Sequence, residues 1–250
     1  MSAMPEFHYA IADEVFKKFP GYVRGVVVAH GVANGASPPE LVQLLREAEE
    51  SVRTLVDPEH VTEEPRINSW REAYRAFGAK PSEFRSSIEA MVRRVLRGDE
   101  LPSINALVDI GNLVSLRYLV PAGGHAIDHL TENLELRFAT GLESFVPFGS
   151  ADTDSDAEVE HPLPGEVVFV EGDVVLTRRW VWRQASATMT LPETRAIEFN
   201  VDGLPPVTPA DGEAACGEIA DLMSRFCGGT SGVTTLSAAN PRMSLAAAEL

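Results

Sequence analysis

The sequence predicts an α+β fold in which a mixed β-sheet packs with helices. Apolar residues at helical spacing dominate residues 37–118, and short β-branched segments separated by glycine and proline turns follow residue 121. Helices first and strands later favour an α+β fold over a regular alternation of strands and helices. At 250 residues, 44% of them hydrophobic, the chain can bury a sizeable core without disulfide bonds.

The elements are expected in this order. Residues 22–29 are apolar and β-branched and should form a buried strand. Ser37, followed by two prolines, begins a helix that ends before Pro58. Further helices are expected over residues 68–77, 81–97 and 104–118, by their apolar spacing and their glycine stops.

The second half should be built from strands. Pro121, Gly123 and Gly124 indicate a loop before His125. Strands are expected over residues 134–138, 166–170, 174–183 and 195–201. An amphipathic helix at about 211–227 would complete a single domain over residues 1–229, and the Ser-, Thr-, Ala- and Gly-rich residues 230–250 would form a flexible tail.

Cysteine content and the first residues favour a reduced, cytoplasmic protein. The only cysteines, Cys216 and Cys227, lie too close to the C-terminal end to brace the whole fold. No stretch approaches the roughly 20 apolar residues that cross a bilayer, and residues 1–16 lack a basic segment followed by an apolar one. We therefore expect no membrane partner.

Charge is unevenly distributed along the chain. The net charge of −16 argues against nucleic-acid binding, and no DNA partner is expected. However, residues 66–97 hold eight cations and three acids, and a second basic cluster comprises Arg178, Arg179, Arg183 and Arg195. These segments either form a basic face on an acidic body or are solvated helix and strand surface.

Several common binding and catalytic motifs are incomplete or absent in the sequence. The acidic run at residues 152–156 begins like a calcium loop, but Ala157 and Leu163 replace the required glycine and glutamate, which leaves a solvated loop. Glycine-rich phosphate loops and a serine nucleophile elbow are absent from the sequence. His125 and His129 have metal-ligand spacing but lack a third partner, so we expect no metal and no cofactor.

The informative stretch is Leu101 to Tyr118, LPSINALVDIGNLVSLRY, followed by Pro121 and by His-Ala-Ile-Asp at residues 125–128. It resembles the B3/B4 domain, the editing module of the bacterial phenylalanyl-tRNA synthetase β subunit. There Ile-Asn-x-x-Val-Asp-Ile-x-Asn leads into a proline and a His-Ala-Phe-Asp motif. Residues 80–90 and 178–184 make the chain still more similar to free-standing proteins built from this module, and the resemblance covers about residues 20–205.

The resemblance implies a B3/B4-like fold and a reaction. In the family, the module receives the aminoacylated 3′ end of a tRNA and hydrolyses the ester of a wrong amino acid, typically tyrosine on a phenylalanine tRNA. A complete synthetase is not implied, because the remaining residues cannot hold an adenylation domain. Gly111 replaces a motif threonine, and by an ungapped count from Glu193 and Thr194, Asn200 stands where a glutamate helps to recognise the tyrosine hydroxyl. The resemblance therefore does not by itself imply specificity for tyrosine.

The resemblance also names candidate residues. His125 would lie in the editing pocket as the catalytic residue, where it orients a water or the terminal ribose; the alternative is a loop histidine bonded to a backbone carbonyl. Asn105, Asp109 and Asn112 share one helix face and either bind substrate or pin the neighbouring loops.

The strand expected at residues 174–183 supplies further candidates. Trp180 and Trp182 share one strand face and either stack on a terminal base or belong to the core. Gln184 and Asn200 are expected to line the same pocket. The residues expected to contact RNA are Lys80, Arg85, Arg94, Arg179 and Arg183.

Trans-hydrolysis of misacylated tRNA is the function that the resemblance favours. The alternatives are a module that binds an RNA end without catalysis and a binder of amino acids or other small molecules. The sequence leaves the oligomeric state open.

Overall fold

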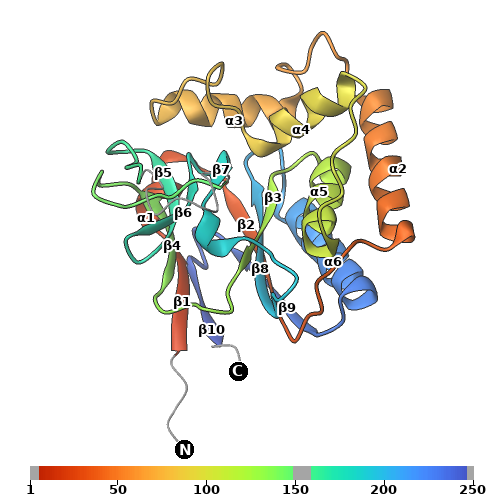
Figure 1. Ribbon diagram of the computed structural model, residues 1–250. Coiled ribbons are helices and arrows are strands. Elements are labelled where there is room, and N and C mark those ends of the chain that lie inside the picture. Colours follow the sequence, from red (N-terminus) through yellow and green to blue (C-terminus); the bar gives the residue numbers. More distant parts are fainter. Residues whose placement is uncertain (1–5, 149–158, 247–250) are drawn as a thin grey trace, which may run out of the picture.

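The computed structural model describes residues 6–148 and 159–246, which form two β-sheets and six helices (Figure 1). The helices are α1 Asp13–Lys18, α2 Pro39–Leu55, α3 Pro65–Ala76, α4 Ser87–Leu96, α5 Ala106–Tyr118 and α6 Pro209–Phe226. The strands are β1 Glu6–Ile11, β2 Val23–His30, β3 Ala122–Ala126, β4 Leu134–Phe138, β5 Val167–Glu171, β6 Val174–Arg178, β7 Arg183–Gln184, β8 Ala196–Gly203, β9 Thr230–Leu236 and β10 Arg242–Ala246. The prediction of an α+β fold is confirmed.

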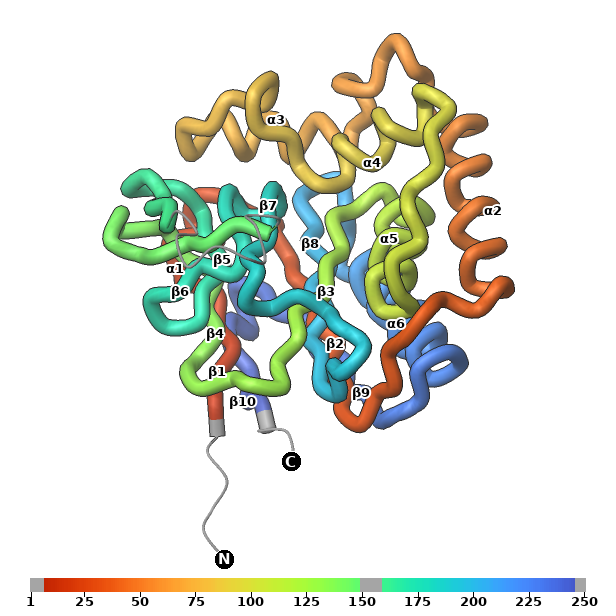
Figure 2. The backbone as a smooth tube through the Cα atoms, in the orientation of Figure 1, coloured from red at the N-terminus to blue at the C-terminus, as the bar shows by residue number. Residues whose placement is uncertain are grey.

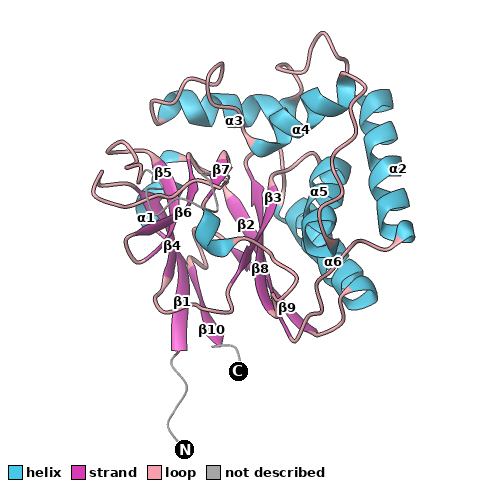
Figure 3. Ribbon diagram, viewed as in Figure 1, coloured by secondary structure: helices cyan, strands magenta, loops and turns pink. Residues whose placement is uncertain are grey.

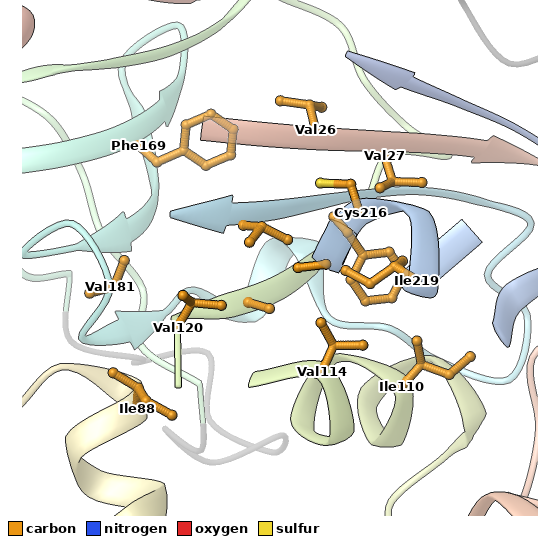
Figure 4. Packing of buried hydrophobic residues seen from close by; sticks show 14 of the residues in the cluster. Val26, Val27, Ile88, Ile110, Val114, Val120, Phe169, Val181, Cys216 and Ile219 are labelled. Atoms are coloured by element: carbon orange, nitrogen blue, oxygen red, sulfur yellow. The ribbon is translucent and has the colours of Figure 1, made fainter. Parts of the chain in front are cut away.

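The four-stranded sheet, in the order β3-β8-β2-β9, is antiparallel throughout. Helices α5 and α6 cover one of its faces (Figure 3). On that side Val27 points toward Cys216 and Ile219, whereas Val26 points to the opposite side, toward Phe169 (Figure 4). Both faces of β2 are therefore buried, as its continuous apolar sequence predicts.

The six-stranded sheet, in the order β10-β1-β4-β5-β6-β7, is mixed because β1 and β4 run parallel. It packs against the face of the four-stranded sheet that the helices leave free. Arg24 and Asp202 form a fully buried ion pair in this layer, with Nε–Oδ1 and Nη2–Oδ2 distances of 2.8 and 3.0 Å. The hydroxyl groups of Tyr9 and Tyr22 also bond this pair, so the layer between the sheets is polar as well as buried.

Helix starts follow local capping chemistry. Helix α4 begins at Ser87 and not at Pro81 as predicted, because the Ser86 side chain accepts from the Glu89 N–H and residues 81–84 form turns. Helix α6 begins with a capping box between Thr208 and Asp211.

The predicted strand over residues 174–183 is wrong beyond Arg178. Arg179 and Trp180 adopt left-handed backbone conformations, with φ of 46° and 65°, and the chain turns there into the short strand β7. Such conformations are costly for residues with side chains. The burial of the Trp180 side chain in the core offsets that cost.

The prediction of a flexible tail is wrong for residues 230–246. Strand β9 pairs with β2, and β10 pairs with β1, which places the first and the last described strands side by side (Figure 2). Leu236 and Leu245 are buried. Sheet pairing with distant strands therefore outweighs the small, polar composition of this segment.

No helix in residues 6–148 and 159–246 is long and apolar enough to span a membrane. The acidic run at residues 152–156 lies outside the described residues.

Candidate functional site

A pocket of about 420 Å³ is lined by residues of edge strand β3, of α4 and α5, and of the turn between β6 and β7. Helix α5 contributes the face that carries Gly111 and Asn112, and the turn contributes Trp182 and Arg183. Asn200 and Phe199 of β8 reach the pocket beside the glycines of β3. Of the residues predicted from the sequence, the pocket brings together Asn112, His125, Trp180, Trp182, Arg183, Gln184 and Asn200.

The three polar residues of α5 have different roles. The Asn105 side chain caps the helix by accepting from Val108 N–H, and it donates to the Thr190 carbonyl at 3.0 Å. Asp109 is fully buried and accepts from the hydroxyl groups of Ser37 and Ser103. These two residues pin loops rather than line the pocket.

Asn112 faces the pocket. Its half-buried carboxamide has no hydrogen-bond partner in the part of the chain that the structure describes. A polar group that is partly removed from water and left unpaired is available to a ligand.

His125 lies on β3, not in a loop. The glycine-rich sequence before it suggests a turn, but residues 122–126 pair along β8. The imidazole is buried, its Nδ1 lies 2.7 Å from the Thr188 hydroxyl, and its Nε2 lies 3.1 Å from the Thr177 hydroxyl. Burial, followed by the positive charge of Arg24, lowers the pKa of His125 to about 3. The ring is therefore neutral near pH 7 and both of its nitrogens are occupied.

The glycines of β3 expose backbone to the pocket. Asp202 N–H donates to the Pro121 carbonyl and Ile127 N–H to the Ala196 carbonyl, so the polar backbone groups of Gly124 point away from β8. Its carbonyl accepts from Gln184 Nε2 at 3.0 Å, and among residues 6–148 and 159–246 nothing accepts its N–H. A Cβ at this position would lie 2.9 Å from Ile197 Cδ1 and 3.0 Å from Phe199 Cε1, so a larger residue would force these side chains to shift.

Gln184 holds this corner of the pocket together. Besides the Gly124 carbonyl, its Nε2 donates to the Thr188 carbonyl at 3.0 Å and lies 3.3 Å from His125 Nδ1. It fixes β3 to the segment that follows β7.

The two candidate tryptophans separate. Trp180 is buried, and its ring lies 4.7, 4.8 and 5.1 Å from the rings of Phe19, Tyr22 and Trp70. It is a core residue whose edge reaches the pocket, so base stacking on Trp180 is ruled out. Trp182 is half-buried, lines the pocket, and contacts the Phe84 ring at 5.1 Å.

Arg179 does not face solvent as predicted. Its guanidinium lies 3.6 Å from the centre of the Phe84 ring and 4.4 Å from that of Trp182, and only 8% of the residue is exposed. The Trp182 ring also lies 5.9 Å from the Arg183 guanidinium. Arg179 therefore supports the aromatic wall from behind and cannot contact a phosphate in solution.

The cations of residues 66–97 are mostly neutralised. Six of the eight form ion pairs, among them Lys80 with Glu83 and Arg66 with Asp211 of α6. Arg94 donates to the Glu100 carbonyl, and Arg85 alone among the eight has no partner within the described residues. The predicted basic face is thus reduced to scattered surface charge.

Glu198 is a buried carboxyl group that sequence reasoning missed. It pairs with His125 across β3 and β8, and its Oε1 accepts from Asn200 Nδ2 at 3.0 Å. Its Oε2 has no partner in the described part of the chain, and burial raises its pKa to about 8. Strand alternation in Ile197–Val201 was the available signal, because it places Glu198 on the same face as Asn200.

The residues that the structure describes contain no group of three or more His, Cys, Asp or Glu side chains placed to hold a metal ion.

Comparison with known proteins places this geometry in a family. The chain matches the family model for the B3/4 domain over residues 69–240. No curated protein matches. Among solved structures, the chain is similar to an N-terminal fragment of the phenylalanyl-tRNA synthetase β subunit from Pyrococcus horikoshii, with 10% identity and a TM-score of 0.42. That likeness covers 91% of this chain and 53% of the fragment, so the chain spans about half of that relative. Because the family model extends over more than half of the chain, from α3 through the pocket to β9, the chain belongs to the B3/4 domain family.

Proposed function

We propose that this protein hydrolyses the ester of misacylated aminoacyl-tRNA in trans, with the pocket beside β3 as its active site. The observation that supports this most directly is the pair of unoccupied neutral donors in the pocket, the Asn112 carboxamide and the Gly124 N–H. Donors of this kind stabilise the oxyanion that forms when an ester is attacked by water. A volume of about 420 Å³ suits an aminoacyl group together with part of its ribose.

In this mechanism the water oxygen bonds to the ester carbonyl carbon, the bond from that carbon to the ribose oxygen breaks, and a water proton passes to the ribose oxygen. The products are a free amino acid and a free 3′ end. His125 is not the base, because burial lowers its pKa to about 3, which makes the ring a poor proton acceptor, and both of its nitrogens are engaged. It positions the Thr177 hydroxyl, which lines the pocket and can orient the water.

A deacylation assay with tRNAs charged with different amino acids, including tyrosine on phenylalanine tRNA, tests the proposal. We expect selective hydrolysis by the purified protein. The Asn112→Ala variant should lower kcat/KM by tenfold or more, since loss of one oxyanion donor costs about 10²–10³ in rate, while the melting temperature stays unchanged. Asn68→Ala, which removes an exposed amide on α3, is the matched control and should match wild type.

A second candidate is a non-catalytic module that binds amino acids. The absence of a titratable base near neutrality among the described residues that line the pocket favours it. Stable esters across the whole panel, together with calorimetric binding of a free amino acid that Asn112→Ala abolishes, would replace hydrolysis by this function.

A further inference from the structure

The pocket has an unusual charge for so acidic a protein. Among the described residues that line it, Arg183 is the one that carries a charge near pH 7, although the whole chain has a net charge of −16. Arg183 has only weak partners, Glu160 at 3.6 Å and the Phe148 carbonyl at 3.5 Å. Its side chain is 40% exposed, so it can meet a ligand anion at the mouth of the pocket.

The surroundings of Arg183 are fixed. The Trp182 ring contacts both Arg183 and the buried Arg179, whose charge has a distant carboxylate partner, Glu166 at 3.8 Å. That carboxylate is already bonded to Arg178 at 2.9 Å through both of its oxygens. The mouth of the pocket therefore carries a small local excess of positive charge.

Beyond the mouth, the surface offers little to a polyanion. The ion pairs of residues 66–97 leave Arg85 as the single unpartnered cation of that segment within the described residues. A protein that holds an RNA body neutralises many phosphates with free Lys and Arg side chains. Elsewhere within the described residues, the cations without an acidic partner are spread over separate segments of the chain: Lys18 of α1, Arg85 before α4, Arg94 near the end of α4, Arg195 before β8 and Arg242 of β10. Among all these cations, Arg183 is the one that lines the pocket.

From this arrangement we infer that the site recognises the aminoacylated terminus alone: the aminoacyl group, its ribose and one flanking phosphate bound by Arg183. The inference rests on the proposed function and narrows its substrate class to 3′-aminoacyl nucleotides, whether or not an RNA body is attached.

Hydrolysis of three esters of the same amino acid tests this inference. They are the full tRNA, 3′-aminoacyl adenosine 5′-monophosphate, and 3′-aminoacyl adenosine without phosphate. We expect kcat/KM for the monophosphate to lie within about tenfold of that for the tRNA, and loss of the phosphate to lower it about tenfold, as for one charge-assisted contact. The logarithm of kcat/KM should fall with the logarithm of salt concentration at a slope of about −0.7 to −1.4, for one or two phosphates.

Variants separate the contact with the phosphate from general damage. Arg183→Gln should lower kcat/KM about tenfold for the monophosphate and leave the ester without phosphate unaffected. Arg97→Gln removes a cation that is paired with Asp99 outside the pocket, and kcat/KM should stay unchanged for both esters.

The outcomes distinguish the two proposals. Rapid hydrolysis of the tRNA with hydrolysis of the monophosphate more than a hundredfold slower, or a salt slope of about −4 or steeper, would overturn this inference and leave trans-editing intact. If neither the aminoacyl-tRNA nor the 3′-aminoacyl monophosphate is hydrolysed, the proposed function fails and the inference fails with it.

Discussion

Glu198 shows how burial turns an ordinary carboxyl group into a neutral one. The side chain is fully buried, and its pKa rises from a usual value of 4.5 to about 8. Between these two values the folded chain holds a proton that the unfolded chain has released. Stability therefore falls as the pH rises from about 4.5 through about 8.

Glu198→Gln tests this effect, because the amide keeps the shape and cannot titrate. We expect the variant to gain stability over wild type as the pH rises, by at least about 1 kcal/mol between pH 5 and pH 8. Urea unfolding at both pH values measures the difference. The exposed Glu193→Gln is the control, and parallel pH profiles for wild type and Glu198→Gln would show that Glu198 is ionised in the fold.

His125 contributes in the opposite direction. Its folded pKa of about 3 lies below the usual 6.5, so its contribution to stability is lost as the pH falls below about 6.5. The two residues face each other across β3 and β8. Near neutral pH, therefore, neither this buried carboxyl group nor the imidazole of His125 in the pocket carries a charge.

At the scale of elements, strands β9 and β10 close the two sheets. Strand β9 covers the outer edge of β2 and β10 covers that of β1, and β1 in turn supports β4. These segments carry few large apolar residues, so their stability depends on pairing and on a small number of buried leucines.

Leu245→Ala tests the contribution of β10. Leu245 is 1% exposed, and its truncation should lower the free energy of unfolding by about 2–5 kcal/mol. Val233→Ala on β9, at 45% exposure, should cost less than about 0.5 kcal/mol. Denaturant unfolding compares the two, and equal, small effects would mean that residues 230–246 do not stabilise the fold.

At the scale of the whole molecule, charge is the dominant property. The excess of 37 acids over 21 Lys and Arg repels polyanions over most of the surface, because most cations already have acidic partners.

Deacylated tRNA should therefore bind poorly. We expect no inhibition of ester hydrolysis by micromolar deacylated tRNA near physiological salt. Its affinity should rise little when the salt concentration is lowered, because the repulsion between the acidic surface and the phosphates then acts over a longer distance. Competition assays at two salt concentrations measure this. A steep rise in inhibition at low salt would reveal a basic face that the ion pairs leave active.

Part of this protein follows from local sequence. The apolar spacing of residues 39–55 and 106–118, the amphipathic pattern of residues 211–226 and the β-branched runs of β2 and β8 predict their elements correctly. These signals are local, because helix and strand periodicity depend on neighbours within a few residues. The motif from Leu101 to residue 128 likewise pointed to the correct family.

Tertiary structure decided which residues the site can use. Asn112 faces the pocket, whereas Asp109, one helical turn away, accepts hydrogen bonds from Ser37 and Ser103. A turn at Arg179 and Trp180 buries both side chains, and the alternation of a strand pattern does not predict such a turn.

Contacts between distant parts of the chain settled the rest. The glycines around residue 123 form a strand because β8 pairs with them, and the basic segment loses its charge to partners as distant as Asp211, which lies 145 residues beyond Arg66. Composition and spacing determine what a residue can do. Burial and pairing, which depend on groups far away in the chain, determine whether it remains free to do so.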